Sequence, residues 1–204
     1  SLVVFTEVGD MLELGEGPEL SLAVSGPFAE GVPEDSRNLV WKAAELAGFR
    51  GGIRLEKHLP HGAGIGGGSS DAAAVLRACG GAERALELGA DVPVCLSERP
   101  QRMEGIGERL SAVPGVPGFD LVLVNPGVNM PTPEVFRALA RKDNPGMGAL
   151  PERVTLDWLA AQRNDLEGAA RSLSGEIGAC LDALGDAQLA RMSGSGSTCF
   201  GIYP

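Results

Sequence analysis

Residues 60–71 read Pro-His-Gly-Ala-Gly-Ile-Gly-Gly-Gly-Ser-Ser-Asp, and the alanine-rich residues 72–76 follow at once. Five glycines within residues 62–68 leave backbone N–H groups uncovered and free to converge. A helix that starts directly after them adds unpaired N–H donors and the positive end of its dipole. The junction therefore predicts an anion-binding cradle of the kind that holds phosphate. A flexible surface loop is the alternative, and a second loop rich in glycine and serine at residues 193–197 favours the cradle.

The composition is that of a globular protein, with 204 residues of which 44% are hydrophobic and 22% are charged. This length fits one large domain or two small ones, and we expect two. No apolar run is long enough to span a bilayer, and no positively flanked signal segment opens the chain. A cytoplasmic location without a membrane partner is therefore expected.

The formal net charge of −10 argues against a nucleic acid or an anionic membrane as partner, because both require a basic surface. A phosphorylated small ligand stays compatible, since a helix N-terminus, a lysine and a bound Mg²⁺ supply enough local positive charge. The cysteines form no CxxC pair, so reduced and buried thiols are expected. These cysteines are Cys79, Cys95, Cys180 and Cys199.

Short apolar or alternating runs and helical periodicities alternate along the chain, which predicts an α+β protein. Strands are expected at residues 2–5, 11–14 and 20–24 (all antiparallel), 52–59, 121–125 and 198–203, with a hairpin at 102–110. Helices are expected at residues 38–47, from 69 or 70 to about 78, and at 83–88 and 132–139, and two or three more around 156–161, 164–173 and 176–184. Two prolines and two glycines in residues 113–118 mark a boundary, which predicts domains at 1–115 and 116–204.

Side chains that can accept a hydrogen bond from an N–H group of the first helical turn predict where helices are capped. Ser36 is expected to cap the helix that contains Asn38, and Ser69 or Ser70 the alanine-rich helix. Thr132 is expected to cap a helix that has Pro133 at its first position. Asn38 is also a candidate for contact with a nucleotide base, although a capping amide is the favoured interpretation.

Two common nucleotide motifs fit the glycine loop poorly. The loop lacks the Gly-Lys-Ser/Thr ending of a P-loop, so a Walker-type site is not expected. Residues 62–67 do satisfy a GxGxxG string, which is typical of dinucleotide folds. In those folds a buried strand runs directly into the first glycine, whereas here an amphipathic strand and the polar residues 56–58 precede the loop. An NAD-dependent oxidoreductase is therefore a weak alternative.

Residues 60–74 resemble the second signature motif of the GHMP (galactose, homoserine, mevalonate and phosphomevalonate) kinase superfamily. The glycine-rich form is closest to the family that acts on 4-diphosphocytidyl-2-C-methyl-D-erythritol in the non-mevalonate pathway of isoprenoid biosynthesis. Further motifs agree with that family in the same order, and the resemblance covers most of the chain. They lie at residues 89–93, 125–127 with Thr132-Pro133 downstream, 164–167 and 192–197.

The resemblance implies a two-domain kinase with mixed and antiparallel sheets, packed helices and an active site in the interdomain cleft. It implies ATP-dependent phosphorylation of the substrate's 2-hydroxyl with Mg²⁺, and it makes Asp91 the catalytic aspartate. A cap or turn aspartate before Val92-Pro93 is the alternative for Asp91. By the same resemblance the ATP phosphates are bound by Pro60, His61, Gly62, Ala63, Gly64, Ile65, Gly66, Gly67, Gly68, Ser69 and Ser70.

Candidate substrate-binding residues flank this loop and recur later in the chain. Lys57 is a candidate for contact with a diphosphate, with a solvated strand-edge lysine as its alternative. His58 is a candidate for contact with cytosine, although a surface or loop position is the default for both His58 and His61. The remaining candidates are Thr132, Gly194, Ser195 and Gly196.

The sequence does not identify the ligands of Mg²⁺. Ser69, Ser70 and Asp71 are candidates for placing Mg²⁺, but helix capping explains the serines without a metal. The small-molecule substrate is the expected partner, and a monomer or weak homodimer is the expected state.

Some family motifs have no counterpart within the 204 residues. By the resemblance, a Pro-Ala-Lys-x-Asn segment with a catalytic lysine and an Asp-Gly-Tyr-His segment that stacks on cytidine belong before residue 1. Two alternatives therefore stand beside the kinase. One is a GHMP-fold protein that binds a nucleotide without turnover, and the other is a GHMP kinase of the homoserine or mevalonate type.

Overall fold

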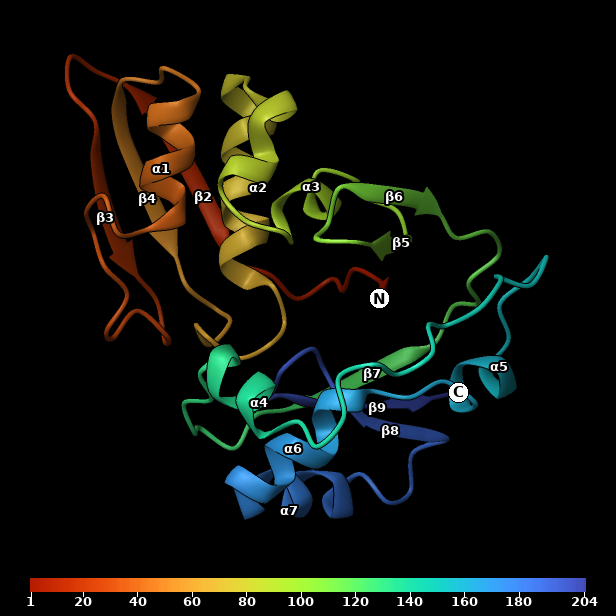
Figure 1. The fold of residues 1–204 in the computed structure, drawn as a ribbon. Coiled ribbons are helices and arrows are strands. Elements are labelled where there is room, and N and C mark those ends of the chain that lie inside the picture. Colours follow the sequence, from red (N-terminus) through yellow and green to blue (C-terminus); the bar gives the residue numbers. More distant parts are fainter. The chain divides into compact units, whose positions relative to one another are not determined.

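The computed structural model describes residues 1–204 in full and divides them into two units (Figure 1). The first unit contains residues 1–61 and 66–112, and the second contains residues 62–65 and 113–204. The centre of the glycine loop is thus counted with the second unit, whereas both of its ends belong to the first.

Each unit combines short strands with helices, which confirms the predicted α+β class. The first unit holds β1 (Leu2–Val3), β2 (Met11–Glu16), β3 (Ser21–Ser25), α1 (Leu39–Leu46), β4 (Gly51–Glu56), α2 (Gly67–Cys79), the 3₁₀ helix η1 (Ala82–Glu87), α3 (Val92–Cys95), β5 (Gln101–Glu104) and β6 (Arg109–Ala112). The second holds β7 (Asp120–Val124), α4 (Thr132–Ala138), α5 (Leu156–Ala160), α6 (Asp165–Leu173), α7 (Gly175–Ala183), β8 (Leu189–Met192) and β9 (Cys199–Tyr203).

The strand β4 lies at the centre of the sheet β2-β4-β3 and leads to the glycine loop. Its residues alternate between buried and exposed, as the sequence predicts for a half-buried strand. Ile53 and Leu55 point to the buried face, where α1 and α2 lie side by side against the sheet (Figure 1). The alternation therefore fixes which face of β4 carries the helices.

The prediction that the first three strands are all antiparallel is wrong for β3. Strand β2 is antiparallel to β4, with Met11 opposite Glu56, but β3 is parallel to β4, with Ser21 opposite Gly52. The reason is that α1 separates β3 from β4 in the chain. A strand that returns through a helix on one face of the sheet arrives parallel, whereas antiparallel neighbours are commonly joined by a tight turn.

Small side chains let α1 and α2 pack closely over this sheet. Ala43 and Ala44 of α1 and Ala72 and Ala73 of α2 are fully buried, together with Val75. Each fully buried valine or leucine in such a core contributes about 1.5–3 kcal/mol to the free energy of folding. The start of α2 is therefore held by a packed core directly behind it.

The second unit is built on the antiparallel sheet β7-β9-β8. A core of buried residues from α4, α6, α7 and the sheet packs around Ile177, Met192 and Cys199. Strands β8 and β9 are joined by residues 193–198, so the second glycine- and serine-rich loop connects two paired strands.

All three predicted side-chain caps are wrong in the same way: the helix begins at a different residue. Asn38, rather than Ser36, caps α1, with its Oδ1 accepting from Val40 N at 2.9 Å and its Nδ2 donating to Pro33 O at 2.7 Å. Gly66 precedes α2 in a left-handed conformation, so Ser69 and Ser70 lie inside the first turn. Pro131 precedes α4, which places Thr132 and Pro133 within that helix.

Other local predictions hold in part, since β4 ends at Glu56 and β1 at Val3, before the predicted ends, and the helix expected at 83–88 is the 3₁₀ helix η1. Residues 101–112 form the antiparallel hairpin β5–β6, and the three helices α5, α6 and α7 occur where periodicity placed them. All four cysteines are free, and three are buried while Cys79 is partly buried. Burial raises the pKa of the Cys199 thiol to about 11, which keeps it protonated. None of the helices combines the length and apolar character that crossing a membrane requires.

Candidate active site

The glycine loop connects β4 to α2 by a backbone that only glycine adopts readily. Gly62, Gly64 and Gly66 have φ angles of +65°, +74° and +71°. A side chain at such angles costs about 1–2 kcal/mol per residue, so this alternation of glycines is required by the backbone. The residue between each pair keeps an ordinary conformation, and the chain turns repeatedly before it enters α2.

No side chain caps the N-terminus of α2. Gly66 occupies the cap position and has no side chain that can accept from the first turn. The unpaired N–H groups of this turn and the positive end of the dipole of a 13-residue helix remain available to an anion. The local structure therefore has the donors that the sequence predicts for a phosphate cradle.

The centre of this loop contacts the second glycine-rich loop within the second unit. Ser193 Oγ donates to Gly64 O at 2.9 Å, and Thr198 N donates to Ala63 O at 3.1 Å. A Cβ on Gly64 would lie 2.5 Å from Gly196 O, which leaves no space for any other residue. The structure therefore brings residues 62–65 and 193–198 together, although they are far apart in the sequence.

The second loop is anchored by the N-terminus of α6. Asn164 caps this helix through Oδ1, and its Nδ2 donates to both Met192 O and Gly194 O at 2.8 Å. Glu167 Oε2 accepts from Met192 N at 3.0 Å. One amide and one carboxylate from a single helix turn thus hold three backbone groups at the beginning of the loop.

Hydroxyl groups complete the support of the second loop. Thr132 Oγ1 and Ser195 Oγ share a hydrogen bond of 2.8 Å, and Thr132 is exposed while Ser195 is partly exposed. Ser197 Oγ donates to Val128 O at 2.7 Å, and Asn125 Nδ2 donates to Thr198 Oγ1 at 2.8 Å. The Thr132–Ser195 pair is therefore the part of this network that solvent or a ligand can reach.

Asp91 lies at the start of the short helix α3 and is exposed. Its carboxylate makes no capping bond, which removes the main structural explanation for an aspartate before Val92-Pro93. The preceding carbonyl, Ala90 O, packs against the hairpin turn at Gly107, where a Cβ would lie only 2.1 Å away. Asp91 is thus held on a supported backbone while its carboxylate stays free.

Asp71 of α2 and Asp91 both act on the thiol of Cys95. Burial raises the pKa of Cys95 to about 11, and the carboxylates of Asp91 and Asp71 add to this rise. Asp71 belongs to α2 and Asp91 directly precedes α3, so both carboxylates lie in the first unit.

The structure places Lys57 in the core, so the alternative of a solvated strand-edge lysine is wrong. Its side chain is 2% exposed, and its ammonium forms ion pairs with Asp10 and, at 3.0 Å, with Asp71. Burial raises the pKa of Asp71 to about 6, the Lys57 ammonium opposes that rise, and Asp10 adds to it. The Lys57 ammonium is thus engaged by two carboxylates in this structure, and its contact with a diphosphate stays a prediction.

The two histidines differ in their surroundings. His58 is partly exposed, with Nε2 3.1 Å from Glu56 Oε1, and its backbone N–H donates to Asp10. His61 is exposed in the glycine loop and lies beside Gly31, where a Cβ would be 3.5 Å from its Cε1. Neither belongs to a group of three or more metal-ligating side chains, and the chain contains no such group.

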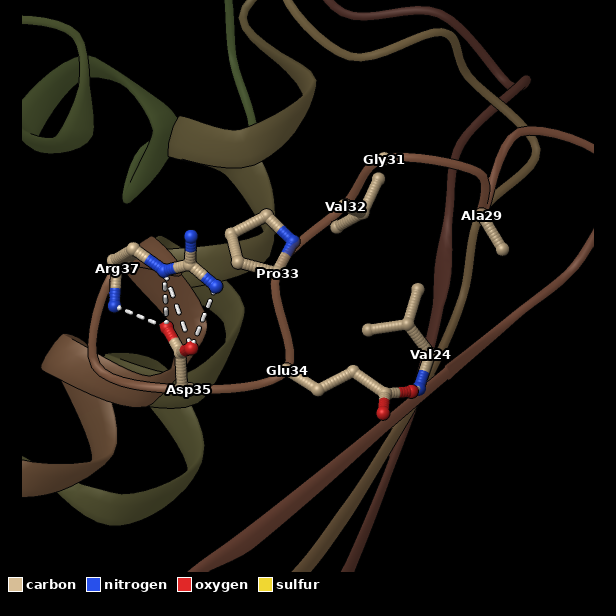
Figure 2. Close-up of a pocket in the computed structure, with 8 residues that line it drawn as sticks. All are labelled: Val24, Ala29, Gly31, Val32, Pro33, Glu34, Asp35 and Arg37. Carbon is tan, nitrogen blue, oxygen red and sulfur yellow. Dashed lines mark hydrogen bonds and ion pairs between the residues drawn. The ribbon is translucent and has the colours of Figure 1, made fainter.

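An open pocket of about 760 Å³ lies between the end of β3 and the start of α1 (Figure 2). Asp35 and Arg37 form a forked ion pair on its wall at 2.7 Å, and Glu34 Oε1 accepts from Val24 N. It is lined by Val24, Ala29, Gly31, Val32, Pro33, Glu34, Asp35 and Arg37. None of the predicted site residues lines this pocket, but Gly31 adjoins His61. Asn38 beyond it caps α1 through Oδ1, as its favoured interpretation predicts, and its Nδ2 donates to Pro33 O.

Sequence reasoning missed the side chains that support the two loops. Asp10 gives no signal, because an aspartate after glycine reads as a turn residue. Asn164 and Glu167 lie in a family motif but were given no role. Asp71 carries a usable signal, since a carboxylate followed by three buried or partly buried alanines requires a buried partner.

Comparison with known proteins supplies the family. Residues 38–98 match the GHMP kinases N terminal domain, and residues 135–204 match the GHMP kinases C terminal domain. The 4-diphosphocytidyl-2-C-methyl-D-erythritol kinases of Paracoccus denitrificans and Dinoroseobacter shibae are 53% and 54% identical to this chain. Both alignments cover 100% of the chain and, respectively, 77% and 76% of the relative.

Solved structures agree with this assignment. A crystal structure of 4-(cytidine 5'-diphospho)-2C-methyl-D-erythritol kinase superposes with a TM-score of 0.66 at 33% identity, covering 95% of this chain and 75% of that one. Homoserine kinase from Cytophaga hutchinsonii has a TM-score of 0.67 at 16% identity, with the same coverage, and shares the fold. The chain therefore belongs to the 4-diphosphocytidyl-2-C-methyl-D-erythritol kinase family of the GHMP kinases.

Proposed function

We propose that this protein transfers the γ-phosphoryl group of ATP to the 2-hydroxyl of 4-diphosphocytidyl-2-C-methyl-D-erythritol, in the non-mevalonate pathway of isoprenoid biosynthesis. The observation that carries the proposal is the uncapped N-terminus of α2 behind a loop of positive-φ glycines. Such a loop presents backbone N–H donors to phosphate oxygens, and Pro60 to Ser70 is the segment assigned to ATP.

Asp91 is the proposed proton acceptor. In the transfer, the acceptor oxygen bonds to the γ-phosphorus, the bond from that phosphorus to the β-phosphate oxygen breaks, and the hydroxyl proton passes to the Asp91 carboxylate. Its exposure and the absence of a capping bond support this role, since a carboxylate committed to a cap is less able to accept a proton. ADP and the phosphorylated acceptor are the products.

Mg²⁺ belongs to the proposal as the ion that neutralises the phosphates. It is commonly held by one or two carboxylates together with substrate phosphates and water, so a dedicated cluster of protein ligands is not needed. The hydroxyls of Ser69 and Ser70 are free of capping bonds in the first turn of α2 and suit such an ion's preference for oxygen.

The acceptor is assigned to the second loop. The exposed Thr132–Ser195 hydroxyl pair offers donors and acceptors to a polar ligand, and the backbone of Gly194 and Gly196 lies beside it. His58 stays a proposed contact to cytosine, because its ring is partly exposed. Supporting side chains fix the backbone of this loop, so its exposed hydroxyls are presented in a defined geometry.

The test is a coupled ADP-release assay on the full-length gene product. We expect release with 4-diphosphocytidyl-2-C-methyl-D-erythritol and none above background with homoserine or mevalonate. ATP binding without release for any acceptor would instead support a nucleotide-binding protein that does not turn over. Release with homoserine or mevalonate alone would reassign the acceptor within the GHMP kinases.

Asp91→Asn tests the chemistry, because it keeps the shape of the side chain and removes the base. We expect turnover to fall by a factor of about 100 or more, with ATP affinity by calorimetry retained. Asp120→Asn, at an exposed aspartate of β7, is the control and keeps full turnover. Equal turnover in Asp91→Asn and Asp120→Asn would remove Asp91 from the mechanism.

A further inference from the structure

The buried charges beneath the glycine loop are more costly than a packed core requires. The side chains of Lys57, Asp10 and Asp71 are 2%, 0% and 6% exposed. Moving each ion out of water costs several kcal/mol, and apolar residues of the same volume often give equal or greater stability. The cluster, which we name the buried triad, therefore calls for a role in addition to stability.

The members of the triad join the two ends of the glycine loop. Asp10 Oδ1 accepts from His58 N at 2.6 Å and from Leu59 N at 2.8 Å, and these two residues lead into the loop. Asp10 Oδ2 pairs with Lys57, and Lys57 Nζ donates to Asp71 Oδ2 at 3.0 Å on α2. The path of contacts runs from the loop entry to the helix that follows the loop, entirely within the first unit.

The triad also lies against the start of α2. A Cβ on Gly67, the first residue of this helix, would lie 3.5 Å from Asp10 Oδ2 and 3.7 Å from Lys57 Nζ. The backbone of the uncapped turn therefore rests on the ion pair. A shift in either contact would move the turn that presents the N–H donors.

We propose that Asp10, Lys57 and Asp71 are positioning residues that set the spacing between the entry of the glycine loop and the first turn of α2, and through it the affinity for the phosphates of ATP. None of the three touches the nucleotide in this assignment. The inference rests on the proposed function only in naming ATP as the ligand of the loop.

The matched pair Asp71→Leu and Asp71→Asn tests the triad, with ATP binding measured by calorimetry in the absence of acceptor. Asp71→Leu removes the acceptor of the Lys57 hydrogen bond, and we expect ATP affinity to fall tenfold or more. Asp71→Asn retains a carbonyl oxygen for Lys57, and affinity is expected to stay within about threefold of the wild type. The KM for the cytidyl acceptor changes less than twofold in both. Asp182→Leu, an exposed helical aspartate in α7, is the control and binds ATP normally.

Each outcome separates this inference from the proposed function. Equal ATP affinity in folded Asp71→Leu and wild type refutes the triad proposal and leaves the kinase reaction untouched. A wild type that binds ATP but phosphorylates no acceptor refutes the proposed function alone. If Asp71→Leu does not fold, Asp71→Asn decides: a tenfold loss of ATP affinity in that folded variant overturns positioning through the Lys57 contact.

Discussion

The two glycine-rich loops of this protein are held by different forces. The first, residues 60–68, has its ends joined by buried charges, with Lys57 between two carboxylates. The second, residues 193–197, is held by Asn164, Glu167 and hydroxyl groups at partly exposed positions. Removing one partner of a buried ion pair costs about 3–5 kcal/mol. A hydrogen bond contributes about 0.5–1.5 kcal/mol when it is neutral and about 1.5–3 kcal/mol when it involves a charged group such as the Glu167 carboxylate. The first loop therefore depends on one buried cluster of charges, and the second depends on several separate hydrogen bonds.

Lys57→Met gives the largest effect expected from this difference. It leaves Asp10 and Asp71 buried without their counter-charge, which destabilises the fold by about 3–5 kcal/mol. Arg54→Met in β4 is the control, because the Arg54 side chain is 81% exposed and its ion pair with Glu13 is worth at most about 1 kcal/mol. Urea denaturation measures both. A Lys57→Met loss no larger than that of Arg54→Met would mean that the triad is energetically inert.

Gly64→Ala breaks the place where the two loops meet. Its Cβ would lie 2.5 Å from Gly196 O and 2.7 Å from Ser193 O, in addition to the strain of a left-handed alanine. We expect a loss of about 3 kcal/mol in thermal or urea unfolding. Gly66→Ala is the matched control, since its φ is similar at +71° but nothing lies within 4 Å of the added Cβ. It should lose only about 1–2 kcal/mol. Equal losses of stability in the two variants would show that backbone strain, rather than the contact between the loops, causes the loss.

A pH titration sharpens the comparison, because the first loop is supported by a carboxylate of raised pKa. The pKa of Asp71 is raised from 3.8 to about 6, so the folded state binds its proton more tightly than the unfolded state. The contribution of the protonated Asp71 to the stability of the fold is therefore complete below about pH 4 and is lost as pH rises through about 6.

The measurement is the difference in unfolding free energy between wild type and Asp71→Asn from pH 4 to pH 7. This difference should fall with pH, by at most about 1.4 kcal/mol per pH unit for one proton. Carboxylates of lowered pKa, such as Asp35 with its Arg37 partner, act in the opposite direction but cancel because both proteins contain them. A flat or rising difference would contradict a raised pKa at Asp71.

Local features of the fold were predictable because their causes are local. The alternation in β4 and the periodicity of α6 and α7 depend only on which residues face the core. The direction of β3 depends on its partner, and a strand pattern does not contain that information. Two of the three caps failed because Gly66 and Pro131 begin helices by backbone conformation, without a side-chain signal.

The chemistry of the site was predictable only in part. The glycine loop and Asp91 are contiguous motifs, and each was found as such. The buried triad joins Asp10 to Lys57 across 47 residues and depends on tertiary packing that no spacing rule expresses. Lys57 illustrates the difference, since the same lysine at an edge strand would be solvated, whereas β3 and α2 bury it here.

Asn164→Asp has the smallest expected effect and tests how the second loop is held. The carboxylate still caps α6 through the N–H of Leu166, but it cannot donate to Met192 O or Gly194 O. We expect a loss of about 1–2 kcal/mol and a severalfold higher KM for the acceptor, with ATP affinity unchanged. Asn38→Asp in α1 is the control, since it also keeps a cap and loses one bond to Pro33 O, away from either loop. An acceptor KM that rises equally in both variants would show that the second loop does not depend on the hydrogen bonds from Asn164 to Met192 O and Gly194 O.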